Sequence, residues 1–175
     1  MIDLVFPSVD LAASWRAGVA EFPPGAVLHG FGYDDQLGFE LATAAGFADF
    51  VQSLRDAERG VGLPAGWVPC TTYWIIDSAE PDQLLGSLAL RHHLENDFLA
   101  EYGGHIGYGV RPSARRRGVA SAALRASLPR ARALGLDQVM LTCDDDNLAS
   151  RATIEGCGGV FERMAGQRRR YWIAT

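Results

Sequence analysis

Hydrophobic residues recur at helical spacing in the first third of the chain. In residues 11–21 and 47–59 apolar side chains lie three or four positions apart, a spacing that predicts two amphipathic helices. Ser8 or Asp10 precedes the first helix and is suited to cap it. Residues 22–46, between the two helices, are rich in Gly and Pro with scattered aromatics. We expect an ordered loop or a lid in this stretch.

After the Gly- and Pro-rich residues 60–66 the pattern changes to short runs with strand character. Residues 71–76 and 84–90 are two such runs, and the turn-forming residues 77–82 separate them. We therefore predict an antiparallel hairpin. Residues 105–110 predict a further strand, which ends where the chain reaches an Arg-Pro pair.

The second half of the chain alternates helices and strands. Apolar residues form one stripe along 119–131 and predict a helix, and residues 138–143 predict a short buried strand. A helix over about 148–155 follows an Asp/Asn cluster suited to capping. Residues 160–164 and 168–173 flank a turn and predict a closing hairpin. This order predicts an α+β fold with an α/β-type, βαβ centre.

Composition indicates one globular domain. The 175 residues are 48% hydrophobic and 21% charged, and no run approaches the ~18 apolar residues of a membrane span. The first residues lack the basic start and long apolar run of a signal peptide. We expect a soluble, cytoplasmic single domain over 1–175 with no membrane partner, in which 1–66 is helical and 67–175 holds the sheet.

Charge and cysteine content exclude several kinds of chemistry. All 16 basic residues are arginines, so any mechanism that needs a lysine, such as phosphate binding by a P-loop, is excluded. The net charge of −5 favours a cationic partner over nucleic acid. Cys70, Cys143 and Cys157 are odd in number and lack metal-ligand spacing, so we expect packing residues.

A strand that stops at Pro112 and resumes as a helix near Gly118 leaves unpaired N–H groups at the helix start. Gly118 has no Cβ, so a diphosphate can approach the main chain closely. Arg115, Arg116 and Arg117 add positive charge beside it. These features indicate an anion site, and the alternative is a solvated arginine run at a helix start.

The sequence Val110-Arg111-Pro112, followed by Arg115-Arg116-Arg117-Gly118-Val119-Ala120, resembles the GNAT superfamily of acetyltransferases. The fingerprint of that family is Gln/Arg-x-x-Gly-x-Gly/Ala, and the stretch from 103 to about 161 fits it. The resemblance implies a GNAT-like, mixed but mostly antiparallel sheet of about six to seven strands flanked by about four helices. It also implies acetyl-coenzyme A as co-substrate, and no metal.

The resemblance assigns cofactor contacts as well. In that family the strand before the motif hydrogen-bonds the pantetheine arm, and the amides of the motif hold the pyrophosphate. The segment from Asp146 to Ser150 resembles the one whose asparagine contacts the arm, and Gly158-Gly159 stands where the family usually has Gly-Phe. The cofactor-binding residues implied are Val110, Arg115, Arg116, Arg117, Gly118, Val119, Ala120, Asn147 and Ser150.

Two positions depart from the family pattern. Ile154 stands where many members have a tyrosine that protonates the leaving thiolate, so that role is not carried over. A thiol with a pKa of about 8.5 is a tolerable leaving group, and water or another side chain can protonate it. Pro129 lies inside the main helix, and we expect it to kink or loosen the helix there.

The reaction needs a base, because an alkylammonium group with a pKa of about 10 must lose a proton before it attacks. His105 is the first candidate, on the strand that leads into the motif. In a regular strand Gly107 and Gly109 share its face and leave a slot for the pantetheine arm. A bulge would bring Tyr108 into the site instead, and Glu101 is the third candidate. The alternative for His105 is a histidine bonded locally at a strand end.

Three other polar clusters have structural explanations. His92 and His93 are adjacent in a strand and face opposite ways, which argues against a shared metal. Residues 144–146 are three aspartates, and we interpret them as helix caps because the spaced oxygen ligands of a calcium loop are missing. Residues 168–170 are arginines that we place on an exposed sheet edge. Nucleic-acid binding by the two arginine runs is a further interpretation.

The sequence therefore indicates an N-acetyltransferase that transfers acetyl from acetyl-coenzyme A to a primary amine of a small molecule or peptide. Direct attack in a ternary complex is expected. The alternative is a catalytically weak regulatory module that binds acyl-coenzyme A, a hypothesis motivated by Ile154. The identity of the acceptor stays open, and the C-terminal hairpin is a plausible edge for a homodimer.

Overall fold

Seven strands form two antiparallel sheets in the computed structural model, which describes residues 1–33 and 38–175. The α+β class is confirmed. The strands are β1 (Ile2–Val5), β2 (Cys70–Asp77), β3 (Glu80–Arg91), β4 (Ile106–Val110), β5 (Gln138–Asp144), β6 (Val160–Ala165) and β7 (Arg168–Ala174). The helical segments are η1 (Val9–Leu11), α1 (Ala12–Val19), α2 (Ala44–Glu58), η3 (Leu99–Gly103), η4 (Pro112–Ala114), α3 (Val119–Ala133) and α4 (Leu148–Gly156).

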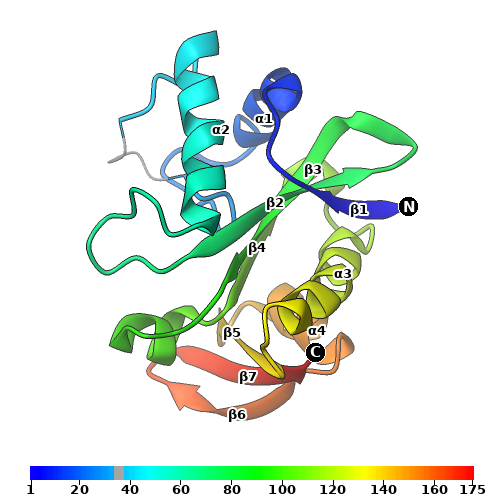
Figure 1. Cartoon of the computed structure of the whole chain (residues 1–175). Helices are drawn as coiled ribbons and strands as arrows, with labels where there is room; N and C mark the ends of the chain where they lie inside the picture. Colours follow the sequence, from blue (N-terminus) through cyan, green and yellow to red (C-terminus); the bar gives the residue numbers. More distant parts are fainter. Residues whose placement is uncertain (34–37) are drawn as a thin grey trace.

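The strand orders are β1-β2-β3-β4 and β5-β7-β6 (Figure 1). The number of strands agrees with the prediction, but they divide between two sheets instead of forming one. Within the described residues, β4 and β5 share no ladder, and the only backbone hydrogen bond near their junction joins His105 to Met140. From that point the two sheets separate, with β4 as the edge of one and β5 as the edge of the other.

Helices cover both faces of the four-stranded sheet. Figure 1 shows α1 and α2 on one face and α3 on the other, with the three-stranded sheet below. The core under α1 and α2 is strongly aromatic, and Trp15, Phe50 and Trp74 are fully buried in it. The core on the α3 side is mostly aliphatic. No helix in the described parts of the chain is long and apolar enough to cross a membrane.

The first strand was not expected. In β1, Leu4 is buried while its neighbours are more exposed, and Ile2 pairs with Asp77 of β2. The N-terminal ammonium group lies 2.6 Å from the Asp77 carboxylate and fixes the start of this strand. The alternation of Ile2, Asp3 and Leu4 was a strand signal, although only four residues long.

Several element boundaries differ from the prediction. The hairpin turn is shorter than residues 77–82, because β3 already begins at Glu80. The second helix begins at Ala44, after Thr43, whose side chain accepts a hydrogen bond from the Gly46 N–H at 3.0 Å. Helix α3 runs through Pro129 to Ala133, two residues beyond the predicted stripe.

The expectation that residues 168–170 lie on a sheet edge was wrong. Strand β7 is central, with β5 on one side and β6 on the other, and Arg170 is buried. The edges of this sheet are β5 and β6, and Val160, Phe161 and Met164 of β6 are exposed. The sequence pattern of the β6–β7 hairpin does not show that β5 pairs with the other side of β7.

Candidate active site

The N-terminus of α3 offers free backbone donors. Gly118 caps the helix with φ 76°, and no side chain bonds to the amides of the first turn. In the part of the chain that the structure describes, the N–H groups of Val119, Ala120 and Ser121 have no acceptor. A Cβ built on Gly118 meets no atom within 4 Å, so the space above these amides is open. The helix dipole makes this open end favourable for an anion.

The three arginines before Gly118 differ in their contacts. The Nε of Arg115 donates to the Val110 carbonyl oxygen at 3.1 Å, and its guanidinium lies 5.4 Å from the centre of the Phe22 ring. Arg116 has φ 61°, a left-handed conformation that is uncommon for a residue with a side chain. The side chains of Arg116 and Arg117 are exposed and make no hydrogen bond within residues 1–33 and 38–175. They are the two cations available to a phosphate.

The loop between β4 and α3 is held in place by the end of α1. Glu21 accepts hydrogen bonds from the Arg111 guanidinium and from the Ser113 N–H at 2.8 Å. The Arg111 and Ser113 donors lower the pKa of Glu21 to about 2, so the carboxylate is charged at neutral pH. These bonds fix the chain just before the open helix end, and no sequence signal linked Glu21 to a loop 90 residues away.

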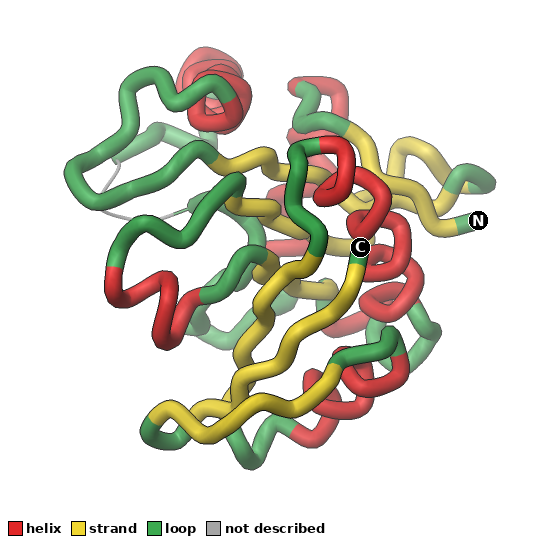
Figure 2. Tube along the Cα trace, turned by 60° about the horizontal axis from the view of Figure 1, so that its bottom comes forward, coloured by secondary structure: helices red, strands yellow, loops and turns green. Residues whose placement is uncertain are grey.

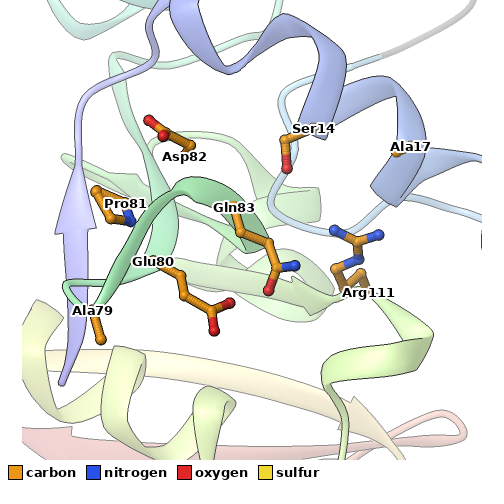
Figure 3. A pocket seen from close by; sticks show the side chains of 8 residues that line it. All are labelled: Ser14, Ala17, Ala79, Glu80, Pro81, Asp82, Gln83 and Arg111. Carbon is orange, nitrogen blue, oxygen red and sulfur yellow. The ribbon is translucent and has the colours of Figure 1, made fainter.

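An open depression of about 520 Å³ lies between α1 and the start of β3, with Arg111 at its edge (Figure 3). Glu80 and Asp82 line it, and Arg111 is already paired with Glu21. The carboxylates disfavour phosphate there. The free amides of α3 are therefore the better diphosphate site.

Beyond the His105–Met140 contact the described residues of β4 and β5 share no backbone hydrogen bond, and we call this unpaired stretch the β4–β5 opening. Tyr108, in the middle of β4, is half-buried and points to the α4 side, where its hydroxyl lies 3.1 Å from Ser150 Oγ. Burial raises the pKa of Tyr108 to about 12, so the phenol keeps its proton. Cys143 of β5 is buried nearby, and its burial raises the pKa of its thiol. Two hydroxyl groups thus lie together at the opening.

In the Asp/Asn cluster before α4, the residue that caps the helix is not one of the predicted aspartates. Asn147 is the cap, since its Oδ1 accepts from the Ser150 N–H at 3.0 Å. Asp144 and Asp145 instead pair with Arg168 at 3.1 Å and Arg169 at 2.5 Å. The interpretation of all three aspartates as caps was therefore wrong. Two of them neutralise arginines of β7.

All three candidate catalytic residues have internal partners, and that of Tyr108 is Ser150. The Nδ1 of His105 accepts from the Met140 N–H at 2.9 Å, and burial lowers the pKa of His105 to about 4. The Glu101 carboxylate receives hydrogen bonds from Arg163 and from Arg170, which hold its pKa below the usual range. Tyr108 is the candidate that faces the opening.

The slot expected beside Gly107 and Gly109 is filled by the chain itself. A Cβ on Gly109 would lie 2.6 Å from the His29 carbonyl oxygen, and one on Gly30 would lie 2.6 Å from the Gly107 carbonyl oxygen. Ser87 Oγ donates to the Gly30 carbonyl oxygen at 2.8 Å and fixes this crossing. Part of the segment 22–46, expected as a loop or lid, thus covers β4; its residues 34–37 lie outside the described residues.

The remaining polar clusters are structural within the described residues. His92 Nε2 lies 2.9 Å from Thr71 Oγ1, and no group of three or more His, Cys, Asp or Glu side chains there is arranged to hold a metal. The thiols of Cys70 and Cys157 are free, and their burial raises their pKa values. Each arginine of β7 is paired with a carboxylate. This pairing neutralises the arginines of the second run, 168–170.

A family model described as an acetyltransferase (GNAT) domain matches residues 35–160. The chain belongs to the GNAT acetyltransferase family. Solved structures that share the fold hold acetyl-coenzyme A or coenzyme A, in agreement with the donor that the resemblance implies. A comparison with curated proteins found no match.

Solved structures of other GNAT acetyltransferases share the fold. Mycobacterium smegmatis RimJ in complex with CoA-disulfide is 20% identical, with 99% of this chain and 82% of that chain covered and a TM-score of 0.67. The Salmonella typhimurium enzyme that modifies the N-terminal serine of ribosomal protein L7/L12 is 16% identical, with 99% and 95% covered and a TM-score of 0.64. The microcin C7 self immunity acetyltransferase MccE, in complex with acetyl-CoA and AMP, is 14% identical, with 99% and 92% covered and a TM-score of 0.62.

Proposed function

We propose that this GNAT domain is an N-acetyltransferase that transfers acetyl from acetyl-coenzyme A to a primary amine by direct attack in a ternary complex. The observation that carries the proposal is the open end of α3, where three amides that have no acceptor among the described residues face free space beside the exposed Arg116 and Arg117. Such a site suits the diphosphate of the donor. The opening between β4 and β5 starts beside it and suits the pantetheine arm.

The cofactor contacts then follow from position. Amides of residues 119–121 would hold the diphosphate, with Arg116 and Arg117 at its rim. Arg115 would support the site indirectly, because its Nε donates to the Val110 carbonyl oxygen and holds the loop in place. Asn147 would contact the pantetheine arm through its Nδ2 group, because its Oδ1 already accepts the hydrogen bond that caps α4.

For the leaving group we propose Tyr108 as the donor that replaces the absent tyrosine at position 154. Ile154 is fully buried in the core and brings no proton. The Tyr108 hydroxyl reaches the first turn of α4 from β4, and Ser150 beside it can relay a proton. When the intermediate collapses, the C–S bond breaks, the amine nitrogen loses a proton and the thiolate gains one. With a pKa near 12, Tyr108 stabilises the sulfur by donating a hydrogen bond.

For the acceptor amine we propose His29 as the base. His29 lies on the segment that crosses β4, and Arg168, Asp144 and Arg91 act electrostatically on its ring. Partial burial and the two arginines lower its pKa, against the opposing effect of Asp144, so the imidazole is neutral at pH 7. Activity should fall only as the pH drops below the ordinary histidine value of 6.5.

The acceptor class follows from the relatives only as a proposal. The Salmonella relative acetylates a protein N-terminus, so peptides that begin with serine or alanine are the first acceptors to test, alongside small amines. Release of free thiol from acetyl-coenzyme A in the presence of these acceptors measures turnover. Binding of coenzyme A without turnover of any acceptor would favour the regulatory module instead.

Tyr108→Phe tests the mechanism. We expect kcat to fall about 10- to 100-fold while the affinity for coenzyme A is unchanged, because the ring stays and only the hydroxyl is lost. Tyr102→Phe, on an exposed residue outside the opening, is the matched control. Unaltered turnover in Tyr108→Phe would remove this residue from the mechanism.

The proposal also covers the location of the enzyme and its assembly. We propose a cytoplasmic enzyme, in keeping with its three free thiols. We also propose that the exposed β6 edge, with Val160, Phe161 and Met164, pairs with a second copy. Sedimentation of wild type and Phe161→Glu would test that edge, and a monomer in both would contradict it.

A further inference from the structure

His105 sits at the point where the two sheets meet. Its backbone N–H donates to the Met140 carbonyl oxygen at 2.7 Å, and its Nδ1 accepts from the Met140 N–H at 2.9 Å. Its own carbonyl oxygen accepts from the Arg91 N–H at 2.8 Å, so it is tied to β3 as well. Only 6% of His105 is exposed. His105, the residue just before β4, therefore satisfies both backbone groups of Met140 in the second sheet.

The approach of the two chains at this point is close. Gly104 has φ 71°, and a Cβ built on it would lie 2.6 Å from the Met140 carbonyl oxygen. Met140 also pairs with Trp172 of β7, whose ring lies 6.3 Å from the His105 ring. The contact is thus packed from both sides and leaves the imidazole little room to turn.

The imidazole takes the place of a strand partner here. Without it the Met140 N–H would be a buried donor with no acceptor, a state that proteins avoid. Beyond this contact no described backbone group of β4 bonds to β5, so the strands part over residues 106–110. The His105–Met140 contact is the apex of the opening.

The hydrogen bond also fixes the tautomer. An Nδ1 that accepts a hydrogen bond carries no proton, so the proton of the neutral ring is on Nε2. Burial favours this neutral form, with Arg91 and His93 acting in the same direction. A general base needs a lone pair directed at the amine, and in this ring the available lone pair faces Met140.

We infer that His105 is a positioning residue whose Nδ1 bond to the Met140 amide sets the width of the β4–β5 opening that receives the pantetheine arm. The inference rests on the proposed function for the identity of the arm. The bond itself can be measured without it.

The test compares His105→Asn with His105→Ala. The Asn Oδ1 can take the place of Nδ1 as an acceptor but cannot act as a base. We expect the alanine variant to lose kcat/KM for acetyl-coenzyme A about 10- to 100-fold through misplacement of the arm, and the asparagine variant to keep most of it with the wild-type pH profile. If asparagine and alanine are equally inactive while both bind coenzyme A like wild type, His105 is a base and the inference fails.

A second measurement does not depend on activity. Hydrogen exchange of the Met140 amide, followed by nitrogen-15 NMR, is expected to be about tenfold faster in His105→Ala and close to wild type in His105→Asn. His93→Ala, at a partly exposed neighbouring histidine, is the control. Unchanged exchange in the alanine variant would overturn the inference. If the wild-type protein does not bind coenzyme A, the proposed function fails, and this exchange measurement still decides the role of the bond.

Discussion

Three consecutive arginines occur twice in this chain, at 115–117 and at 168–170, and their surroundings are opposite. In the first run Arg116 and Arg117 are exposed and make no hydrogen bond within the described residues, next to helix amides that also lack acceptors. In the second run every guanidinium meets a carboxylate, and Arg170 is buried between Glu101 and Glu162. The first run is free for a ligand, and the second holds the protein together.

The difference teaches what decides the role of a charge run. Both runs consist of three arginines. Carboxylates from the β5 end, β6 and η3 surround the second run, whereas the first run follows a strand end and faces open space. Figure 2 shows the three strands of the second sheet side by side, which is the arrangement that brings these carboxylates to β7. A positive run is a binding site only where the fold supplies it with no acid.

The largest effect is expected at the glycine that ends the first run. Gly118→Glu places a carboxylate where the diphosphate would lie and forces a left-handed φ on a side chain. We expect the affinity for coenzyme A to fall at least about 100-fold, a change of about 2.7 kcal/mol, measured by calorimetry.

Gly135→Glu is the matched control for this change. Gly135 follows the other end of α3, also has a left-handed φ, of 84°, and also has open space around it. The backbone strain is therefore similar, while the distance from the amides differs. Equal losses of affinity in the two variants would show that strain, and not charge at the site, explains the effect.

The second run is expected to matter for stability. Arg170→Ala leaves Glu101 and Glu162 without their buried partner and removes a hydrogen bond to the Ala100 carbonyl oxygen. We expect a loss of about 2 to 3 kcal/mol in the free energy of unfolding, measured by denaturant titration. Arg169→Ala, at a more exposed ion pair, is expected to lose clearly less. Comparable losses would contradict the distinction.

Acid should reduce the stability that the ion pairs of the second run contribute, whereas the first run has no such contribution to lose. The pKa of Glu101 in the folded protein is lower than its ordinary value of 4.5. Its pairs therefore stabilise the fold fully above that value, and the stabilisation is lost as the pH falls through the lowered one. The gap in melting temperature between wild type and Arg170→Ala is expected to shrink below about pH 4. A constant gap down to pH 3 would argue that Arg170 acts through packing alone.

The smallest effect is expected from the exposed arginines of the first run. The double variant Arg116→Ala/Arg117→Ala is expected to raise KM for acetyl-coenzyme A about tenfold, since exposed charges each contribute modestly. Added salt should weaken the wild type more than the double variant. Arg168→Ala/Arg169→Ala is the control of equal charge, and an equal rise in its KM would mean that net charge alone attracts the donor.

The fold was predictable where the signal was local. Alternation, helical spacing and turn residues identified six of the seven strands and the main helices, and the motif identified the open end of α3. The strand over Ile2–Val5 was missed because four residues carry little periodic signal. The separation into two sheets was missed because it depends on how β4 and β5 meet, a contact between residues 35 positions apart.

For the candidate site, too, local features were predictable from the sequence and long-range contacts were not. Gly118 and its arginines were identifiable because their spacing lies within one turn, and local backbone geometry decides what a helix start can bind. The partners of His105 and Glu101, and the crossing of His29 over β4, were not identifiable, because packing between distant segments decides them. Sequence alone thus determined which helix start has an open N-terminal end, where we propose that an anion is held. Tertiary structure decided which polar side chains remain free to use it, since a buried donor or acceptor must be satisfied by whatever the fold brings beside it.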